Sequence, residues 1–193
     1  MIRTNLFVAV ILLACLPIGA AVFTFDNLTE GTAVPFSDTQ DGITASFTQT
    51  GATFLVQPTF LATLTGNVLL DADEQLGVLT VNFNQILAVV NFGFATNGVG
   101  TLTLTAFLNG QQTCTATTSG GIPPGTNFPE GSIGCQTGTF NSIQISSTAP
   151  DFAIDNLTVR AQNVPEPATV GLAGVALAAL ALHRRAVQRA SLR

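Results

Sequence analysis

Apolar and polar side chains alternate along much of the middle of the chain. In the segment Thr101–Leu108 the apolar positions 102, 104, 106 and 108 are separated by Thr101, Thr103 and Thr105. A period of two places successive side chains on opposite faces of a β-strand, one face buried and the other exposed. Similar alternation, or a short run rich in β-branched and aromatic residues, predicts further strands. They are 22–28, 43–48, 53–56, 77–83, 88–95, 111–117, 139–146 and 152–160.

Turn-forming residues separate these segments. Asn109-Gly110 lies between two predicted strands and is typical of a tight hairpin turn, and Asp41-Gly42 and Asn97-Gly98 are similar signals. About nine short strands follow one another with no helical stretch between them. We therefore expect an all-β domain, an antiparallel β-sandwich with the topology of a jelly roll.

Apolar residues run together at the N-terminus instead of alternating. Arg3 precedes an apolar run at residues 6–16 and a group of small residues that ends at Ala21. These are the three parts of a secretory signal peptide, and the run is shorter than the ~20 residues of a membrane-spanning helix. We expect a signal helix in residues 1–21, export by the Sec machinery and cleavage after Ala21. Leu12–Cys15 loosely resembles a lipoprotein box, so acylation of Cys15 remains an alternative.

The C-terminal segment, residues 164–193, has three consecutive parts. Pro165-Glu166-Pro167 precedes an uncharged apolar run from Ala168 to Leu182, and Arg184-Arg185 begins a basic tail. As a helix the run would span about 22 Å, and arginines reaching to the interface would help it cross a ~30 Å hydrocarbon core. We expect a single transmembrane helix, with the arginines in the cytoplasm and the β-sandwich domain, residues 22–163, outside.

This order of parts resembles the PEP-CTERM sorting signal of Gram-negative bacteria, with Pro165, Glu166, Pro167, Arg184 and Arg185 at the matching positions. The resemblance implies recognition by an exosortase and transient anchoring in the inner membrane. Cleavage near the Pro-Glu-Pro motif would then release the protein to the cell surface or to an exopolysaccharide matrix, where exopolysaccharide is a partner to consider. Some exported domains with such tails resemble carbohydrate-binding jelly rolls, so carbohydrate binding is the alternative function.

Two cysteines, Cys114 and Cys135, remain once residues 1–21 are removed. Export would place them in an oxidising compartment, and we expect them to form a disulfide. The closed loop of about 20 residues would contribute roughly 3 kcal/mol by restricting the unfolded chain. A catalytic thiol would lack a histidine partner, because the single histidine, His183, lies in the C-terminal segment.

Charge and composition narrow the function of the domain between the two ends. The chain has 11 acidic against 6 basic residues and a net charge of −5, and Arg160 is the only basic residue within 22–163. Such an acidic domain does not bind nucleic acid, which requires a basic surface. Without histidine or lysine it also lacks the usual bases and nucleophile activators, so we expect no enzymatic activity. Asp71, Asp73 and Glu74 could still serve acid–base chemistry, but their clustering is more typical of a solvated turn.

The sequence Asp-Asn-Leu-Thr occurs at residues 26–29 and again at 155–158, which suggests that the first and last strands lie side by side. If they pair, Asp26, Glu30 and Asp155 could supply oxygen ligands to Ca²⁺, the only cofactor we consider; strand-end capping is the alternative. Sugar rings usually stack on Trp or Tyr, and this chain has only Phe. A structural or adhesive role is therefore the main hypothesis, and a calcium-stabilised carbohydrate-binding module is the second.

Overall fold

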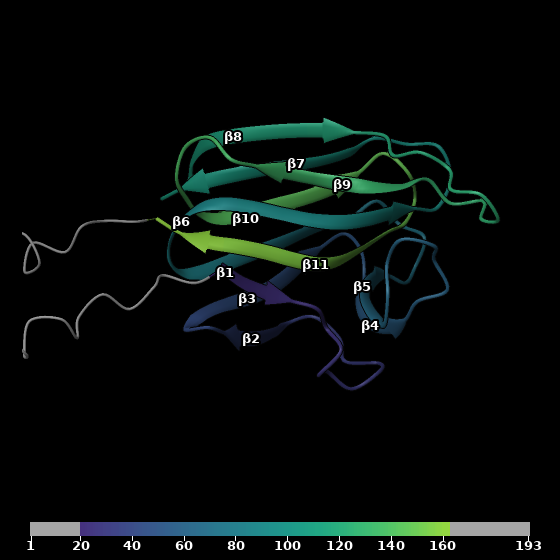
Figure 1. Ribbon diagram of the computed structural model, residues 1–193, viewed down its shortest axis with the longest axis horizontal. Coiled ribbons are helices and arrows are strands. Elements are labelled where there is room, and N and C mark those ends of the chain that lie inside the picture. Colours follow the sequence, from purple (N-terminus) through teal and green to yellow (C-terminus); the bar gives the residue numbers. More distant parts are fainter. Residues whose placement is uncertain (1–19, 163–193) are drawn as a thin grey trace, which may run out of the picture. The chain divides into compact units, whose positions relative to one another are not determined.

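A computed structural model describes residues 20–162, which form antiparallel strands joined by turns and loops (Figure 1). Within these residues there is no helix of the length and apolarity needed to cross a membrane. The expected C-terminal helix and sorting motif, and all of the expected signal helix except Ala20 and Ala21, lie outside the described residues. The strands within 20–162 are β1 (Ala20–Phe23), β2 (Phe36–Gln40), β3 (Ile43–Thr50), β4 (Phe54–Pro58), β5 (Asn67–Asp71), β6 (Val78–Thr96), β7 (Leu102–Leu108), β8 (Gln111–Thr118), β9 (Glu130–Cys135), β10 (Phe140–Ser147) and β11 (Phe152–Ala161).

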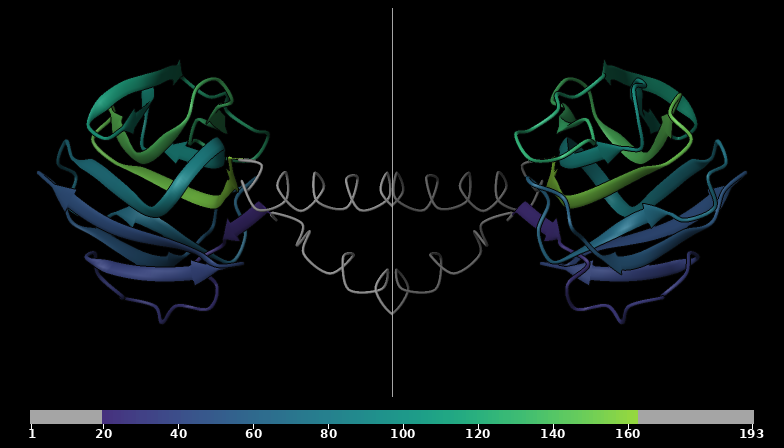
Figure 2. Two further views of the ribbon diagram at one scale, coloured as in Figure 1. Left: turned by 90° about the vertical axis from the view of Figure 1, so that its left-hand side faces the viewer. Right: turned by 90° about the vertical axis from the view of Figure 1, so that its right-hand side faces the viewer.

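The long strand β6 belongs to both layers of a β-sandwich (Figure 2). Its first part pairs with β3 and β10, in a layer that continues from β10 to β7 and β8 and from β3 to β2. Its second part pairs with β9 and β11, in a layer that continues from β11 to β5 and β4. A shift of register in the pairing with β10, between Phe140 and Ser142, marks the point where β6 passes from one layer to the other.

The interior between the two layers is filled by apolar side chains from both. Leu102, Leu104 and Ala106 are fully buried, as the alternation in that segment predicts. Phenylalanine supplies much of the volume, and several rings meet edge to face, for example Phe54 and Phe152 at 5.1 Å between centroids. The largest fully buried aromatic side chains are Phe23, Phe25, Phe47, Phe54, Phe92, Phe94, Phe140 and Phe152.

The predicted hairpin at Asn109-Gly110 joins β7 to β8 and is confirmed. Both residues have positive φ, 51° and 82°, which the two-residue turn requires and which Asn and Gly tolerate best. The predicted pairing of the first and last strands is also confirmed, since Val22 pairs with Thr158 and Phe23 with Leu157. The all-β antiparallel fold is thus as expected, while its finer description as a jelly roll stays a prediction.

Several predicted strand boundaries are wrong. The segments 77–83 and 88–95 are one continuous strand, β6, and the segment 22–28 ends as a strand at Phe23 because Phe25 has a φ of 63°. The short strands β2, β5 and β9 were not expected. Two of them, β2 and β9, lie at an edge of a layer, where a strand is held by its neighbour's backbone and needs little apolar pattern of its own.

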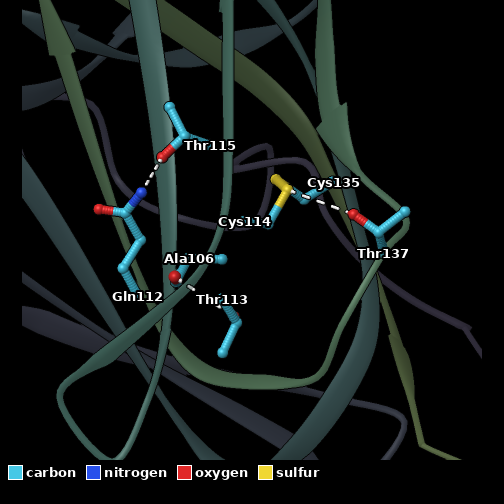
Figure 3. The surroundings of a disulfide bond; sticks show 7 residues. All are labelled: Ala106, Gln112, Thr113, Cys114, Thr115, Cys135 and Thr137. Atoms are coloured by element: carbon cyan, nitrogen blue, oxygen red, sulfur yellow. Dashed lines mark hydrogen bonds between the residues drawn. A yellow bond between two sulfur atoms is a disulfide. The ribbon is translucent and has the colours of Figure 1, made fainter.

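The predicted disulfide between Cys114 and Cys135 is confirmed (Figure 3). Cys114 lies on β8 and Cys135 ends β9, with their Cα atoms 6.2 Å apart. The two strands belong to different layers, so the bond links the layers along one side of the sandwich.

Ala21 is the residue after which we expect the signal peptide to be cleaved. It is buried in β1 and pairs with Val159. Cleavage after Ala21 stays a prediction.

Candidate functional site

A pocket of about 330 Å³ lies beneath the loop that joins β4 to β5, and we call it the loop pocket. Its apolar lining includes Val68 and Leu70 on β5, Ala95 on β6 and Ala153 on β11. Some of these side chains pack with Leu64 of the loop in a small apolar cluster that is separate from the main core. The loop pocket therefore lies on one layer of the sandwich and is not a packing cavity in the core between the layers.

Two phenylalanine rings line the loop pocket. Phe60, in the β4–β5 loop, is 76% exposed, and Phe128, in the β8–β9 loop, is half-buried. Their ring centroids are 5.6 Å apart in an edge-to-face arrangement. An exposed phenylalanine on its own needs no explanation, but a pair beside a cavity offers apolar contact area to a ligand.

Two carboxylates in the lining of the loop pocket are buried and incompletely hydrogen bonded. Asp71, at the end of β5, is 2% exposed, and neither of its carboxylate oxygens has a hydrogen-bond partner. Asp151, just before β11, is 9% exposed; its Oδ2 accepts a hydrogen bond from Asn97 Nδ2, and its Oδ1 has no partner. Buried polar atoms are normally satisfied, so these three oxygens are exceptions. Asp71 shares the strand phase of the core residue Leu69, whereas Val68 and Leu70, which line the loop pocket, have the opposite phase.

The environment of Asp71 favours its protonated form. Burial raises the pKa of Asp71 to about 7; the nearby backbone N–H of Asp73 opposes the shift, and the negative charges of Asp73 and Asp151 add to it. The expectation of a solvated acidic turn is therefore wrong for Asp71, although Asp73 and Glu74 are exposed as expected. Asp73 forms the turn instead, because its carboxylate accepts the N–H groups of Thr53 and Gln75.

Acidic side chains also hold the β4–β5 loop in place. Glu130, at the start of β9, accepts the N–H groups of Ala62 and Thr63 at 2.9 and 2.6 Å and the Thr63 hydroxyl at 2.6 Å. Burial alone would raise the pKa of Glu130, but these three hydrogen bonds hold it below its usual value. Further along the same loop, Asp155 accepts the N–H of Thr65. The roof of the loop pocket is thus fixed by bonds between carboxylates and backbone amides.

Two of the three residues predicted to bind calcium, Asp26 and Asp155, contact the end of this loop. Asp26 accepts the N–H of Asn67 at 2.7 Å, and Asp155, which is fully buried, accepts N–H groups of Thr65 and Asn156. Burial raises the pKa of Asp155, with the charge of Asp26 adding to the effect and the backbone N–H groups opposing it. Glu30 is exposed in the turn after β1. Among residues 20–162 no group of three or more His, Cys, Asp or Glu side chains is arranged to hold a metal ion, and calcium at Asp26, Glu30 and Asp155 stays a prediction.

The main features of the loop pocket are missing from the sequence-based expectations. Phe60, Phe128, Asn97 and Asp151 lie in loops, outside any alternating pattern, and nothing in the sequence brings them together. Asp71 did carry a signal, because in the run 67–71 it shares the strand phase of the fully buried Leu69. That phase indicated an inward-facing carboxylate and not a solvated one.

The described residues define a β-sandwich domain with a disulfide between its layers and an acidic pocket at one loop. The residues that follow it, 163–185, match the family described as the PEP-CTERM protein-sorting motif. The chain is a PEP-CTERM sorting-domain protein, and the motif marks it as an exported protein that an exosortase sorts.

Comparison with curated protein sequences gives no match. Among solved structures, the chain is similar to the K2 cleaved adhesin domain of Lys-gingipain, with a TM-score of 0.52, 11% identity, and coverage of 72% of this chain and 97% of that one. It is less similar to the carbohydrate-binding module CBM32-3 of a family 31 glycoside hydrolase from Clostridium perfringens, with a TM-score of 0.37, 11% identity, and coverage of 50% and 76%. At these identities the likeness to the adhesin domain shows a shared fold and no more.

Proposed function

We propose that the protein is a structural or adhesive component of the cell surface or of the exopolysaccharide matrix, without enzymatic activity. The observation that carries the proposal is the sorting motif at residues 163–185, which indicates export and sorting by an exosortase and so supports that destination. The disulfide between Cys114 and Cys135 supports it, because such bonds persist in the oxidising environment outside the cytoplasm.

The acidic residues of the loop pocket are not arranged as a pair of catalytic carboxylates. Asp71 and Asp151 are its two buried carboxylates, and they come from the ends of the adjoining strands β5 and β11. Both therefore lie on the same wall, whereas glycoside hydrolysis requires two carboxyl groups that flank the bond to be cleaved. The residues of 22–163 include no histidine or lysine that could take over the role of a base.

Localisation in the native host tests the sorting part of the proposal. The wild-type protein is expected to pass through the inner membrane and accumulate in the matrix fraction. Deletion of residues 165–193, or the double substitution Arg184→Ala/Arg185→Ala, should prevent anchoring and correct release. Arg193→Ala, outside the matched motif, serves as the control. Unchanged anchoring and release in the deletion variant would refute exosortase sorting, and unchanged biofilm cohesion in a strain lacking the gene would refute the structural or adhesive role.

Carbohydrate binding at the loop pocket is the second candidate function. Its support is the combination of two phenylalanine rings, which can cover the apolar face of a sugar, with amide side chains of Gln57 and Asn97 in the lining, which can form hydrogen bonds with sugar hydroxyl groups. A glycan array with and without Ca²⁺ tests both this function and the predicted calcium dependence. Binding that Phe60→Ala abolishes would support the assignment, and binding that Phe60→Ala leaves unchanged would contradict it.

A further inference from the structure

The strand β8 forms one edge of its layer, and its outer side has no backbone partner among residues 20–162 (Figure 1). It pairs with β7 alone, in regular register from Cys114 to Thr118 beyond a bulge at Thr113. Every residue of β8 is at least partly exposed. In an antiparallel strand alternate backbone N–H and C=O groups point away from the neighbour, so those of β8 are available to a further strand.

The other edges of the sandwich are protected in ways that β8 is not. The outer side of β4 is covered by the segment 31–34, which forms backbone hydrogen bonds with it. The strand β2 carries Asp38, β1 has only four residues, and β9 contains two glycines and pairs with Gly121 at its first residue. Covering loops, charges and short length commonly keep an edge from pairing with another chain. By contrast, β8 has eight residues and neither a charge nor a proline.

The surroundings of β8 are uncharged although the domain is acidic. Between residues 75 and 150 the only charged side chain is that of Glu130, which is 5% exposed and bonded to the β4–β5 loop. The strands β6 to β10 therefore present no exposed charge. Two copies of an acidic domain repel each other where their carboxylates meet, and the β8 side is a surface on which they can approach without that repulsion.

We propose that β8 pairs edge to edge, in antiparallel orientation, with β8 of a second copy of this chain. A two-fold axis then relates the copies, and the same strand supplies both sides of the interface, as in most homodimers. The proposal rests on the structural or adhesive role proposed above and names the partner for it.

The disulfide keeps this edge in place. Cys114 belongs to β8, and its bond to Cys135 ties β8 to β9 in the other layer (Figure 3). The bond joins side chains only, so it leaves the outer backbone groups of β8 free. An edge that is already ordered loses less conformational freedom when a second strand pairs with it.

The orientation of such a dimer suits adhesion between facing surfaces. Leu87 of β6 pairs both with Phe140, at the start of β10, and with Ala161, at the end of β11. Two residues further along β10, Ser142 pairs with Phe107, beside the β7–β8 turn. This turn therefore lies at the same end of the domain as the end of β11. Antiparallel pairing of β8 reverses one copy relative to the other, so the two β11 strands end at opposite ends of the dimer.

Sedimentation equilibrium of the full-length, disulfide-oxidised chain in detergent tests the pairing. The wild type should form a dimer whose share rises with concentration. With the pair centred on Ala116, Thr115→Glu/Thr117→Glu places like charges opposite each other and should raise the dissociation constant of the dimer about tenfold or more. The matched control is Thr103→Glu/Thr105→Glu, the same change at the cross-strand neighbours on β7. Because it lies one strand away from the edge, it should stay within about twofold of wild type.

Opposite charges should restore the pairing. Thr115→Lys/Thr117→Lys should by itself weaken the dimer as the Glu variant does, whereas an equal mixture of the two variants should form a heterodimer. A misfolded variant could not be rescued in this way, so the mixture identifies contact through β8. In the wild type, hydrogen exchange of the outward N–H groups of β8 should slow as the concentration rises.

Other results would overturn the inference. A wild-type chain that stays monomeric up to about 1 mM, or a dimer that neither variant weakens, would refute pairing through β8. Slow exchange of all β8 N–H groups in the monomer would show that another segment of the chain covers this edge, which would refute it as well.

Biofilm cohesion in a strain lacking the gene separates this inference from the proposed function. Reduced cohesion together with a chain that does not pair through β8 would retain the structural or adhesive role and refute the partner. Unchanged cohesion together with a confirmed dimer would retain the pairing and refute the role.

Discussion

Replacing Asp71 by Asn should make the protein more stable at pH 8 and change little at pH 4. The side chain is 2% exposed, and neither carboxylate oxygen has a hydrogen-bond partner. A carboxyl whose pKa is higher in the folded than in the unfolded chain binds more protons when folded. Its contribution to stability is therefore fully present below the unfolded pKa and is lost as the pH rises through the folded one.

The size of the effect follows from the two pKa values. The pKa of Asp71 is about 7 in the folded protein against 3.8 for an ordinary aspartate, because burial disfavours the charged form. At 1.36 kcal/mol for each pKa unit this amounts to roughly 4 kcal/mol as an upper limit. This difference is a large fraction of the typical unfolding free energy of a protein, about 5–15 kcal/mol, so it is easily measured.

Urea unfolding at several pH values between 4 and 8.5 measures this effect. The quantity to compare is the difference in unfolding free energy between Asp71→Asn and wild type, because the titration of all other groups largely cancels in it. That difference should rise from near zero at pH 4 to a plateau above pH 7. Asp41→Asn, in an exposed turn, should show no such rise. If the difference stayed constant across the pH range, or if the Asn variant were less stable at pH 8, the Asp71 carboxylate would have a stabilising hydrogen-bond partner in the folded protein, which would refute this reasoning.

Three further substitutions test how the sandwich and the pocket loop are held together. The double variant Cys114→Ser/Cys135→Ser should lose roughly 3 kcal/mol of unfolding free energy, and reduction of the wild type should reproduce that loss if the disulfide is its cause. Glu130→Gln should lower the unfolding free energy by about 1.5–3 kcal/mol at pH 7, because an amide oxygen accepts hydrogen bonds from the loop's N–H groups less strongly than a carboxylate. The difference in unfolding free energy between variant and wild type should become smaller as the pH falls through the lowered pKa of Glu130. An equal difference at pH 3 would contradict this reasoning. Gly66→Ala should melt at a lower temperature than Gly98→Ala, since both glycines have positive φ but only the added Cβ at 66 meets an aspartate carboxylate; equal melting temperatures would contradict the packing at 66.

The fold was predictable where one face of a strand is buried. In β7 the alternation of Leu102 and Leu104 with threonine determines both the strand and the face that it buries. The same reasoning could not find β9, because its run Glu130–Cys135 contains two glycines and forms a strand through the backbone of β6. Nor could it recognise β6 as one strand, because the residues around 84–86 interrupt the apolar pattern where the strand changes partners.

The candidate site was much less predictable than the fold, for a physical reason. Asp71 and Asp73 are two residues apart and chemically identical, yet one is buried without a partner and the other forms a turn with two backbone N–H groups. This difference depends on segments far away in the sequence, such as the one that places Asp151 beside β5. The disulfide was accessible from sequence because its argument needed only the number of cysteines and the compartment.

The acidic residues around the loop pocket serve two different purposes, and this division has a testable consequence for binding. Glu130 and Asp155 are occupied by backbone N–H groups of the β4–β5 loop, so they fix the loop without any basic side chain. Asp71 is buried without a hydrogen-bond partner and shares the strand phase of the core residue Leu69. Glu130→Gln loosens the loop that carries Phe60 and should therefore weaken any glycan binding at the loop pocket, whereas Asp71→Asn should leave that binding unchanged. Weaker binding in both variants would show that the Asp71 side chain also contributes to the shape of the loop pocket.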